Sequence, residues 1–239
     1  MSIAQNLERI HHEIAEACAR ANRSPTDVAL MAVSKMHPVE LLLEAHAAGQ
    51  RLFGENRVQE WQQKAETAAS LAGLEMHLIG PLQSNKTTRA AELFHTIQTV
   101  DSLKIATRLN EATRALNRKL PIYIEVKLSH EESKHGLQPA DLPALLDAIA
   151  PLGALIPIGL MTVPPWPADV ANAGAEARPY FQQLRRLRDE ALAKHSTLTG
   201  LSMGMSNDFA AAIEEGSTCV RIGTAIFGKR QPPPPGDAE

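Results

Sequence analysis

The sequence predicts an α/β fold, a single-domain (β/α)8 barrel with an added N-terminal helix. From Val28 onward, apolar β-branched segments alternate with amphipathic segments, and no Gly/Ser-rich linker divides the chain. Eight such alternations over about 200 residues are typical of a closed barrel. Strands that are apolar throughout are expected when helices cover a parallel sheet. A doubly wound open sheet is the alternative that the same alternation allows.

The N-terminal segment predicts a helix over the first 22 residues. Ile3, Leu7, Ile10 and Ile14 recur at steps of three and four residues, which places them on one helix face. Ser2 is suited to cap this helix. Strands are then expected at 28–35, 50–54, 75–80, 96–100, 120–128, 154–163, 199–204 and 219–226. Helices are expected between them at 38–48, 56–72, 84–94, 102–118, 139–150, 173–195 and 207–215.

Single residues mark several boundaries of these elements. Asp101 can cap the helix that follows it, and Pro139 suits a first helical turn. Gly49 and Gly216 suit positions just beyond a helix. The proline-rich stretch 163–167 predicts a stiff loop after the sixth strand.

Composition and charge exclude several classes of protein. The 239 residues, 44% of them hydrophobic, suffice for one large core. A net charge of -3 gives no general attraction to nucleic acid or anionic membranes, and no apolar run is long enough to span a membrane. There is no signal-peptide pattern, and Cys18 and Cys219 have no metal-binding spacing, so we expect a cytoplasmic protein with free thiols. We expect one domain over 1–230 and a disordered Pro-rich tail over 231–239.

Lys35 is the first residue that suggests chemistry, because it closes the apolar strand 28–35. An ammonium at the end of a core strand is costly unless it has a partner or a function. Burial would lower its pKa and make it a nucleophile toward an aldehyde. A lysine that extends its amine to solvent at the strand edge is the structural alternative.

Other polar and glycine residues follow the expected strands at their carboxyl ends, where the active sites of such barrels lie. Asn56 could cap the next helix or line a pocket, and His77 could be a satisfied core histidine or a ligand contact. Met161, at the end of the sixth strand, is a candidate pocket residue. The segment 133–136 (SKHG) could be a polar turn or a mobile lid that carries positive charge for a second anion.

The last two loops predict a phosphate site. Ser206, Asn207 and Asp208 open a helix, whose free N–H groups and positive dipole end favour an anion. Gly223 lets the neighbouring backbone approach the same oxygens, and Thr224 adds a hydroxyl. Barrels often hold phosphate with the loops after strands seven and eight. An ordinary helix cap beside a tight turn is the alternative.

Arg221 lies inside an otherwise apolar strand and needs an acceptor. Glu55 or Glu125 could accept from it, or a ring nitrogen or carboxylate of a ligand. A lysine nucleophile and a phosphate site on one rim suit either a class I aldolase or pyridoxal 5′-phosphate (PLP). Arg221 favours PLP, because PLP has a ring nitrogen that can accept a hydrogen bond from it and a sugar phosphate has none.

Eight motifs along the chain resemble the YggS/PROSC family of PLP homeostasis proteins. They read VSK (33–35), FGEN (53–56) with QE (59–60), LQSNK (82–86), VDS (100–102), SKHG (133–136), GLMT (159–162), LSMGMS (201–206) and VRIGTAIFG (220–228). The resemblance extends from Ile3 to Arg230. Pro81 and Asn207 depart from the family pattern, but neither change removes a group that bonds the cofactor. The proline does put a second-site role of its loop in doubt.

The resemblance implies a fold similar to the N-terminal domain of bacterial alanine racemase, a fold-type III PLP protein. It implies PLP held as a Schiff base on Lys35, with Arg221 facing the pyridine nitrogen. The other implied contacts are Ser206, Gly223 and Thr224 at the phosphate and Asn56 at the pocket. His77 and Met161 are further candidates for the cofactor pocket.

The resemblance also implies a role in intracellular vitamin B6 homeostasis, because the family is associated with PLP supply and amino-acid balance rather than with an established reaction. We therefore expect a monomeric carrier that buffers PLP, with PLP-dependent apoenzymes as candidate partners. The alternative is a fold-type III enzyme such as an amino-acid racemase. Racemisation requires acid/base groups on both faces of the substrate, and neither Tyr123 nor Tyr180 is expected to reach the rim, which favours the carrier.

Overall fold

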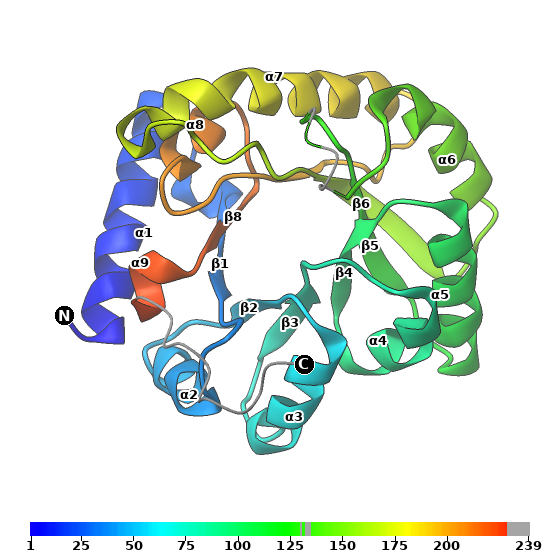
Figure 1. Cartoon of the computed structure of the whole chain (residues 1–239), viewed down its shortest axis with the longest axis horizontal. Coiled ribbons are helices and arrows are strands. Elements are labelled where there is room, and N and C mark those ends of the chain that lie inside the picture. The colour runs from blue at the N-terminus through cyan, green and yellow to red at the C-terminus, as the bar shows by residue number, and fades with distance from the viewer. Residues whose placement is uncertain (130, 132–134, 229–239) are drawn as a thin grey trace.

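In the computed structural model, which describes residues 1–129, 131 and 135–228, eight parallel strands form a closed barrel. The strands follow one another around the ring in chain order, and the last strand pairs with the first (Figure 1). Parallel neighbours need crossover connections, which the surrounding helices provide. The predicted (β/α)8 barrel is therefore confirmed, and the open-sheet alternative is wrong.

Each predicted strand and helix is present, in most cases over a shorter range. The strands are β1 (Ala29–Val33), β2 (Leu52–Glu55), β3 (Glu75–Leu78), β4 (Thr96–Val100), β5 (Leu120–Glu125), β6 (Leu155–Met161), β7 (Gly200–Ser202) and β8 (Cys219–Ile222). The α-helices are α1 (Ile3–Arg20), α2 (Val39–Ala47), α3 (Val58–Ala68), α4 (Thr87–Leu93), α5 (Leu103–Ala115), α6 (Leu142–Ile149), α7 (Ala173–Leu192), α8 (Phe209–Glu214) and α9 (Thr224–Phe227). Short 3-10 helices lie at Pro25–Asp27, Ser84–Lys86, Pro139–Asp141 and Val170–Asn172.

Among the predicted boundaries, the end of the eighth strand differs most clearly from the structure. The strand predicted over 219–226 ends at Ile222, and α9 begins at Thr224. A short apolar run does not distinguish a strand from a buried helical turn, which explains the error. Asp101 does not cap α5, because the N-cap is Ser102.

The remaining boundary predictions agree with the structure. Pro139 opens a 3-10 helix, and Gly49 and Gly216 lie just beyond α2 and α8. The tail 231–239 falls outside the described residues. No helix in the described part of the chain is both long and apolar enough to cross a membrane.

Helix α1 packs on the outside of the barrel beside α8 and α9 (Figure 1). Ser2 caps it as predicted, because its hydroxyl accepts from the Gln5 N–H and the Gln5 side chain accepts from the Ser2 N–H. Asn6 Nδ2 donates to the carbonyl of Ile226 at 2.8 Å, and Arg9 donates to the carbonyl of Ala225 at 3.2 Å. The first helix therefore holds the segment that directly follows the eighth strand.

Replacing Ile10 with alanine tests the packing of α1, because Ile10 is completely buried. We expect Ile10→Ala to lower the free energy of unfolding by about 2–5 kcal/mol through lost burial and the resulting cavity. Urea unfolding measures this change. Glu8→Ala, at an exposed position of the same helix, should change it by no more than about 0.5 kcal/mol. Equal effects of the two substitutions would contradict the packing.

Candidate functional site

Lys35 lies in the turn directly after β1, at the carboxyl end of the barrel, and is half-buried. We call residues 34–37 the lysine turn. The His37 N–H donates to the carbonyl of Ser34 at 3.2 Å. Met36 has a φ of 60°, a left-handed conformation that residues other than glycine seldom adopt. The lysine thus leaves the strand on a tight, conformationally restricted turn.

A buried ionic cluster holds both sides of the lysine turn. Lys64 of α3 donates to Glu55 Oε1 at 2.8 Å, to Glu60 Oε1 at 2.8 Å and to the carbonyl of Ser34 at 3.1 Å. Ser34 Oγ donates to the same Glu55 oxygen at 2.8 Å. Glu60 Oε1 also accepts from the Met36 N–H at 2.5 Å. Both residues that flank Lys35 are therefore held to α3 by hydrogen bonds.

This cluster was not predicted from the sequence. Glu55 is completely buried, and its Oε2 has no hydrogen-bond partner among the described residues. Burial raises the pKa of Glu55, and Lys64 opposes that shift. Glu60 and Lys64 stand four residues apart, a spacing that places two side chains on the same face of a helix. That spacing was the available signal for an ion pair beside the lysine turn.

The loops after β7 and β8 meet next to the end of β1. The Arg221 N–H donates to the carbonyl of Gly204 at 2.9 Å. Gly204 has a φ of +99°, and a Cβ there would lie 2.6 Å from the Cβ of Ala212, so the close approach requires glycine. A Cβ on Gly223 would lie 3.3 Å from the carbonyl oxygen of Val33 in β1. The two loops therefore adjoin each other and the strand that ends at the lysine turn.

The three residues predicted to contact phosphate occupy this junction. Ser206 and Gly223 are half-buried, and Thr224 is exposed. Thr224 is the first residue of α9, and the first N–H groups of a helix have no partner within the helix. The carboxylate of Asp208 accepts from the Met205 N–H at 2.5 Å, which closes the turn before α8. The predicted residues are thus brought together, with backbone donors beside them.

Arg221 has an acceptor, as predicted, but neither expected carboxylate provides it among the described residues. Its Nη1 donates to Ser202 Oγ at 2.7 Å, and its Nη2 donates to the carbonyl of Thr162 at 2.8 Å. Glu55 instead accepts from Lys64. Burial lowers the pKa of Arg221, and nearby anionic or ionisable groups, Glu125 among them, oppose this. The prediction of a carboxylate acceptor was wrong because the actual acceptors, a hydroxyl and a backbone carbonyl, carry no charge that a sequence pattern could reveal.

His77 is a satisfied core histidine, so that interpretation of it is confirmed. Its Nε2 lies 2.8 Å from Glu75 Oε1, and its Nδ1 lies 3.0 Å from Gln98 Nε2. Both ring nitrogens are thus engaged within the protein. The predicted contact between His77 and a ligand stays a prediction.

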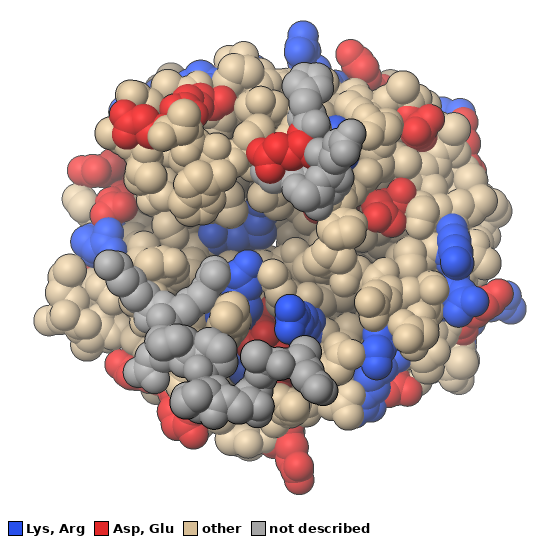
Figure 2. Space-filling view, viewed as in Figure 1, with Lys and Arg blue, Asp and Glu red and all other residues tan. Residues whose placement is uncertain are grey.

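A cavity of about 230 Å³ opens at the barrel mouth. Asn56 lines it rather than capping α3, whose N-cap is Arg57. Glu125 and Ser129 also line the cavity, and each has a buried side-chain oxygen that no described residue bonds. Burial raises the pKa of Glu125 to about 7. Figure 2 shows Lys and Arg side chains gathered in the hollow at the centre of the face it presents.

The structure describes Met161 but only part of the segment 133–136. Met161 ends β6, is completely buried and pairs in register with Ser202. Ser133 and Lys134 fall outside the described residues, so the lid or second anion site there stays a prediction. No group of three or more His, Cys, Asp or Glu residues in the described part of the chain could hold a metal ion.

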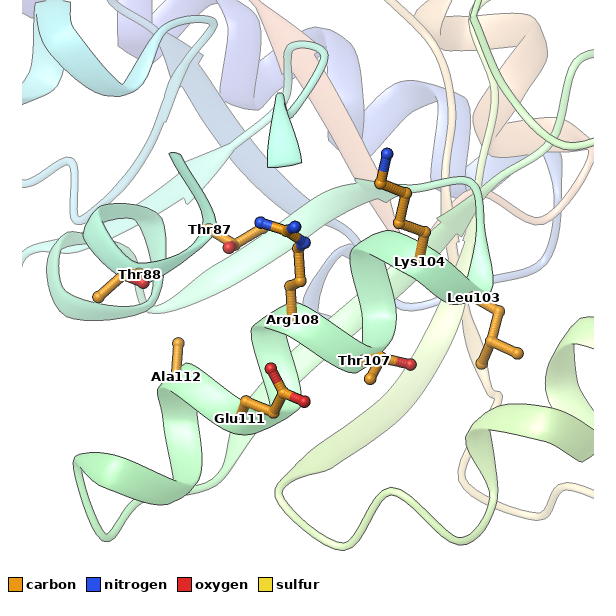
Figure 3. Close-up of a pocket in the computed structure, with 8 residues that line it drawn as sticks. All are labelled: Thr87, Thr88, Leu103, Lys104, Thr107, Arg108, Glu111 and Ala112. Atoms are coloured by element: carbon orange, nitrogen blue, oxygen red, sulfur yellow. The ribbon is translucent and has the colours of Figure 1, made fainter. Parts of the chain in front are cut away.

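A larger hollow, of about 740 Å³, lies on the flank of the barrel between α4 and α5 (Figure 3). Arg108 extends from α5 toward Thr87 of α4 and donates to the carbonyl of Ser84 at 3.2 Å. This hollow is lined by helix residues such as Lys104 and by none of the predicted site residues. The candidate site is therefore the carboxyl end of the barrel. Of the predicted site residues Asn56 lines the mouth cavity, whereas the lysine turn and the last two loops lie at the same end of the barrel without lining it.

Comparison with known proteins assigns the chain to a family. It matches the alanine racemase N-terminal domain over residues 5–231. A pyridoxal phosphate homeostasis protein of Vibrio cholerae serotype O1 is 47% identical over 237 residues, which cover 96% of this chain and 97% of the relative. The protein of the same name in Escherichia coli K12 is 44% identical, and the match covers 95% and 97% of the two chains.

Solved structures agree with this assignment. PipY of Synechococcus elongatus PCC7942, solved with PLP bound, aligns with a TM-score of 0.83 at 39% identity over 95% of this chain and 100% of that one. An alanine racemase of Clostridium difficile 630 aligns with a TM-score of 0.70 at 16% identity over 99% of this chain and 58% of that one, which shows a shared fold alone. The chain therefore belongs to the pyridoxal phosphate homeostasis protein family, which is built on the fold of the alanine racemase N-terminal domain.

Proposed function

We propose that this protein binds PLP and serves vitamin B6 homeostasis by holding the cofactor and releasing it to PLP-dependent apoenzymes. The observation that carries the proposal is the junction of the lysine turn with the loops after β7 and β8. The names of the relatives and the PLP-bound PipY structure support it. We further propose a cytoplasmic monomer with one domain over 1–230. The two free, buried cysteines are consistent with a reducing compartment.

The residues at this junction fit three parts of PLP. The amine of Lys35 can bond to the aldehyde, and the N–H groups at the start of α9 with the Thr224 hydroxyl suit the phosphate. Arg221 has only donors, so it suits an unprotonated ring nitrogen. When bound, PLP supplies an electrophilic aldehyde and a conjugated ring. A donor-only partner keeps that ring nitrogen unprotonated and so limits the ring as an electron sink, as expected for a carrier.

Covalent trapping tests the position of the cofactor. Protein incubated with PLP should become yellow, and borohydride reduction followed by peptide mass analysis should find the reduced cofactor on Lys35. Lys35→Ala should abolish the label, since no other amine lies on the lysine turn. Lys86→Ala, in the 3-10 helix that follows β3 rather than on the lysine turn, should keep it. A label found only on Lys86 or Lys134 would contradict the site.

Amino-acid racemisation is the second candidate function, and the carboxyl of Glu125 in the mouth cavity favours it. Glu125 has a pKa of about 7, which suits proton transfer near neutral pH. Racemisation needs a second group on the opposite face of the substrate. Tyr123 is buried at 8% exposure inside the barrel, where a Cβ on Gly159 would lie 2.5 Å from its ring. Tyr180 lies on α7. The carrier therefore remains the better-supported function.

A racemase assay distinguishes the two candidates. We expect no steady turnover of common L-amino acids by the PLP-loaded protein, because one acid/base group cannot serve both faces. Chiral chromatography of the product measures this. Steady turnover that is lost in both Lys35→Ala and Glu125→Gln would overturn the carrier proposal.

The pH dependence of stability tests the environment of Glu125. Its pKa is raised from 4.5 to about 7, so its contribution to stability is present below pH 4.5 and is lost as the pH rises through about 7. Glu125→Gln is neutral at every pH. Relative to this variant, the wild type should lose about 3 kcal/mol of unfolding free energy between pH 4.5 and 8, measured by urea unfolding. A difference that stays constant with pH would refute the raised pKa.

A further inference from the structure

A series of hydrogen bonds crosses the barrel from Arg221 to Glu75. Arg221 Nη1 donates to Ser202 Oγ at 2.7 Å, and Ser202 Oγ donates to Gln98 Oε1 at 2.6 Å. Gln98 Nε2 lies 3.0 Å from His77 Nδ1, and His77 Nε2 lies 2.8 Å from Glu75 Oε1. The Ser202–Gln98 bond joins β7 to β4, which are not neighbours in the ring, so the series passes through the barrel interior. We call its last four residues the interior chain.

Ser202, Gln98 and His77 of the interior chain are buried, whereas Glu75 at its far end is exposed to solvent. Gln98 and Ser202 are 0% exposed and His77 is 6% exposed. The side chain of Glu75, the first residue of β3, is 52% exposed at the end of the barrel opposite the mouth. Barrel interiors are commonly filled by branched apolar side chains, and buried polar groups are costly unless they are bonded. A polar connection between the two ends of the barrel is therefore an unusual use of this space.

With the Gln98 amide oriented as in the structure, its Oε1 toward Ser202, the donors and acceptors of this series run in one direction. Arginine has donors only, so Ser202 accepts from it and gives its own proton to Gln98 Oε1. The Gln98 amide nitrogen then donates to His77 Nδ1, which must be unprotonated. The remaining ring proton lies on Nε2 and is donated to the Glu75 carboxylate. In each of these hydrogen bonds the donor is the residue nearer to Arg221 and the acceptor is the next residue along the series. The last acceptor is the carboxylate of Glu75.

Two further observations indicate that the direction of these hydrogen bonds affects Arg221. The hydrogen bond from His77 lowers the pKa of Glu75, which favours its carboxylate form. Arg221 is 5% exposed, and the two acceptors of its side chain among the described residues, Ser202 Oγ and the Thr162 carbonyl, are both neutral. The other titratable groups that influence it, without accepting one of these bonds, are Cys219, Asp208, Glu125 and Tyr123. The orientation of the guanidinium therefore depends on Ser202, and that of Ser202 on the interior chain.

We propose that the interior chain positions the guanidinium of Arg221 for the ring nitrogen of the cofactor, with Glu75 as a counter-charge at the opposite end of the barrel. The proposal rests on the proposed function, because PLP provides that ring nitrogen. Ser202, Gln98 and His77 act as positioning residues. A substitution at Glu75, on the far side of the barrel, changes the electronic spectrum of the cofactor bound at the mouth.

The first experiment uses the protein without cofactor. Nitrogen-15 NMR of the wild type should show His77 protonated on Nε2 and separate, slowly exchanging Nη signals from Arg221. Gln98→Leu removes both bonds of the amide and should merge the Arg221 signals. Gln98→Glu keeps an acceptor for Ser202 and should preserve them. Arg221 signals that are unchanged in Gln98→Leu would overturn the positioning role.

The second experiment uses the PLP-loaded protein. Gln98→Leu should raise the PLP dissociation constant on the order of tenfold, as for a lost charged hydrogen bond, and shift the visible absorption maximum. Glu75→Gln should shift the maximum in the same direction, whereas Glu111→Gln, an exposed control on α5, should not. Gln98→Glu keeps the acceptor for Ser202 but brings a negative charge nearer to Arg221 than Glu75 is, so it should shift the maximum in the opposite direction. Borohydride should label Lys35 in every variant, because the lysine turn is not changed.

The outcomes separate this proposal from the proposed function. A wild type that takes up no PLP defeats the proposed function, and the Arg221 signals of the unloaded protein then still decide the positioning role. PLP uptake with an unshifted maximum in Glu75→Gln defeats the remote counter-charge alone. If Gln98→Leu does not fold, Ser202→Ala takes its place, since it removes the hydroxyl that accepts from Arg221 and changes only one atom. Merged Arg221 signals in this variant support the positioning role, and unchanged signals overturn it.

Discussion

The pairing of β1 with β8 is the constraint on which the candidate site depends. It places Met31 opposite Arg221 and Ala32 opposite Ile222, so that the lysine turn and the last loop leave the barrel side by side. These segments stand almost at opposite ends of the sequence. In an open sheet they would be edge strands, and the amine, the guanidinium and the phosphate loops would not share one rim. Closure of the ring therefore creates the site as well as the core.

Two buried polar systems then determine the geometry within that frame. The ionic cluster of Lys64 with Glu55 and Glu60 holds the residues on either side of Lys35. The interior chain holds Arg221 from the opposite side of the barrel. Buried ionic and polar groups add little to stability compared with apolar packing. Their value here lies in fixing side-chain direction, which apolar contacts specify less sharply.

Much of the fold and part of the site could be predicted from the sequence. Periodicity revealed the alternating strands and helices, and the carboxyl ends of the strands indicated that Lys35 and the loops after β7 and β8 lie at the same end of the barrel. The partners of Arg221 could not be predicted, since Thr162 contributes a backbone carbonyl and Ser202 a hydroxyl whose role depends on a residue across the barrel. The boundary between β8 and α9 was missed because the apolar run from Ile222 to Phe227 suits either conformation.

The bonds from Asn6 and Arg9 to the carbonyls of Ile226 and Ala225 have a consequence for how the protein matures. During vectorial synthesis on the ribosome, Lys35 emerges early, long before Arg221 and Gly223. A nascent chain at that stage has the lysine but not the loops after β7 and β8. Helix α1 can bond to Ala225 and Ile226 only after β8 has been made, so the proposed binding site forms when the ring closes.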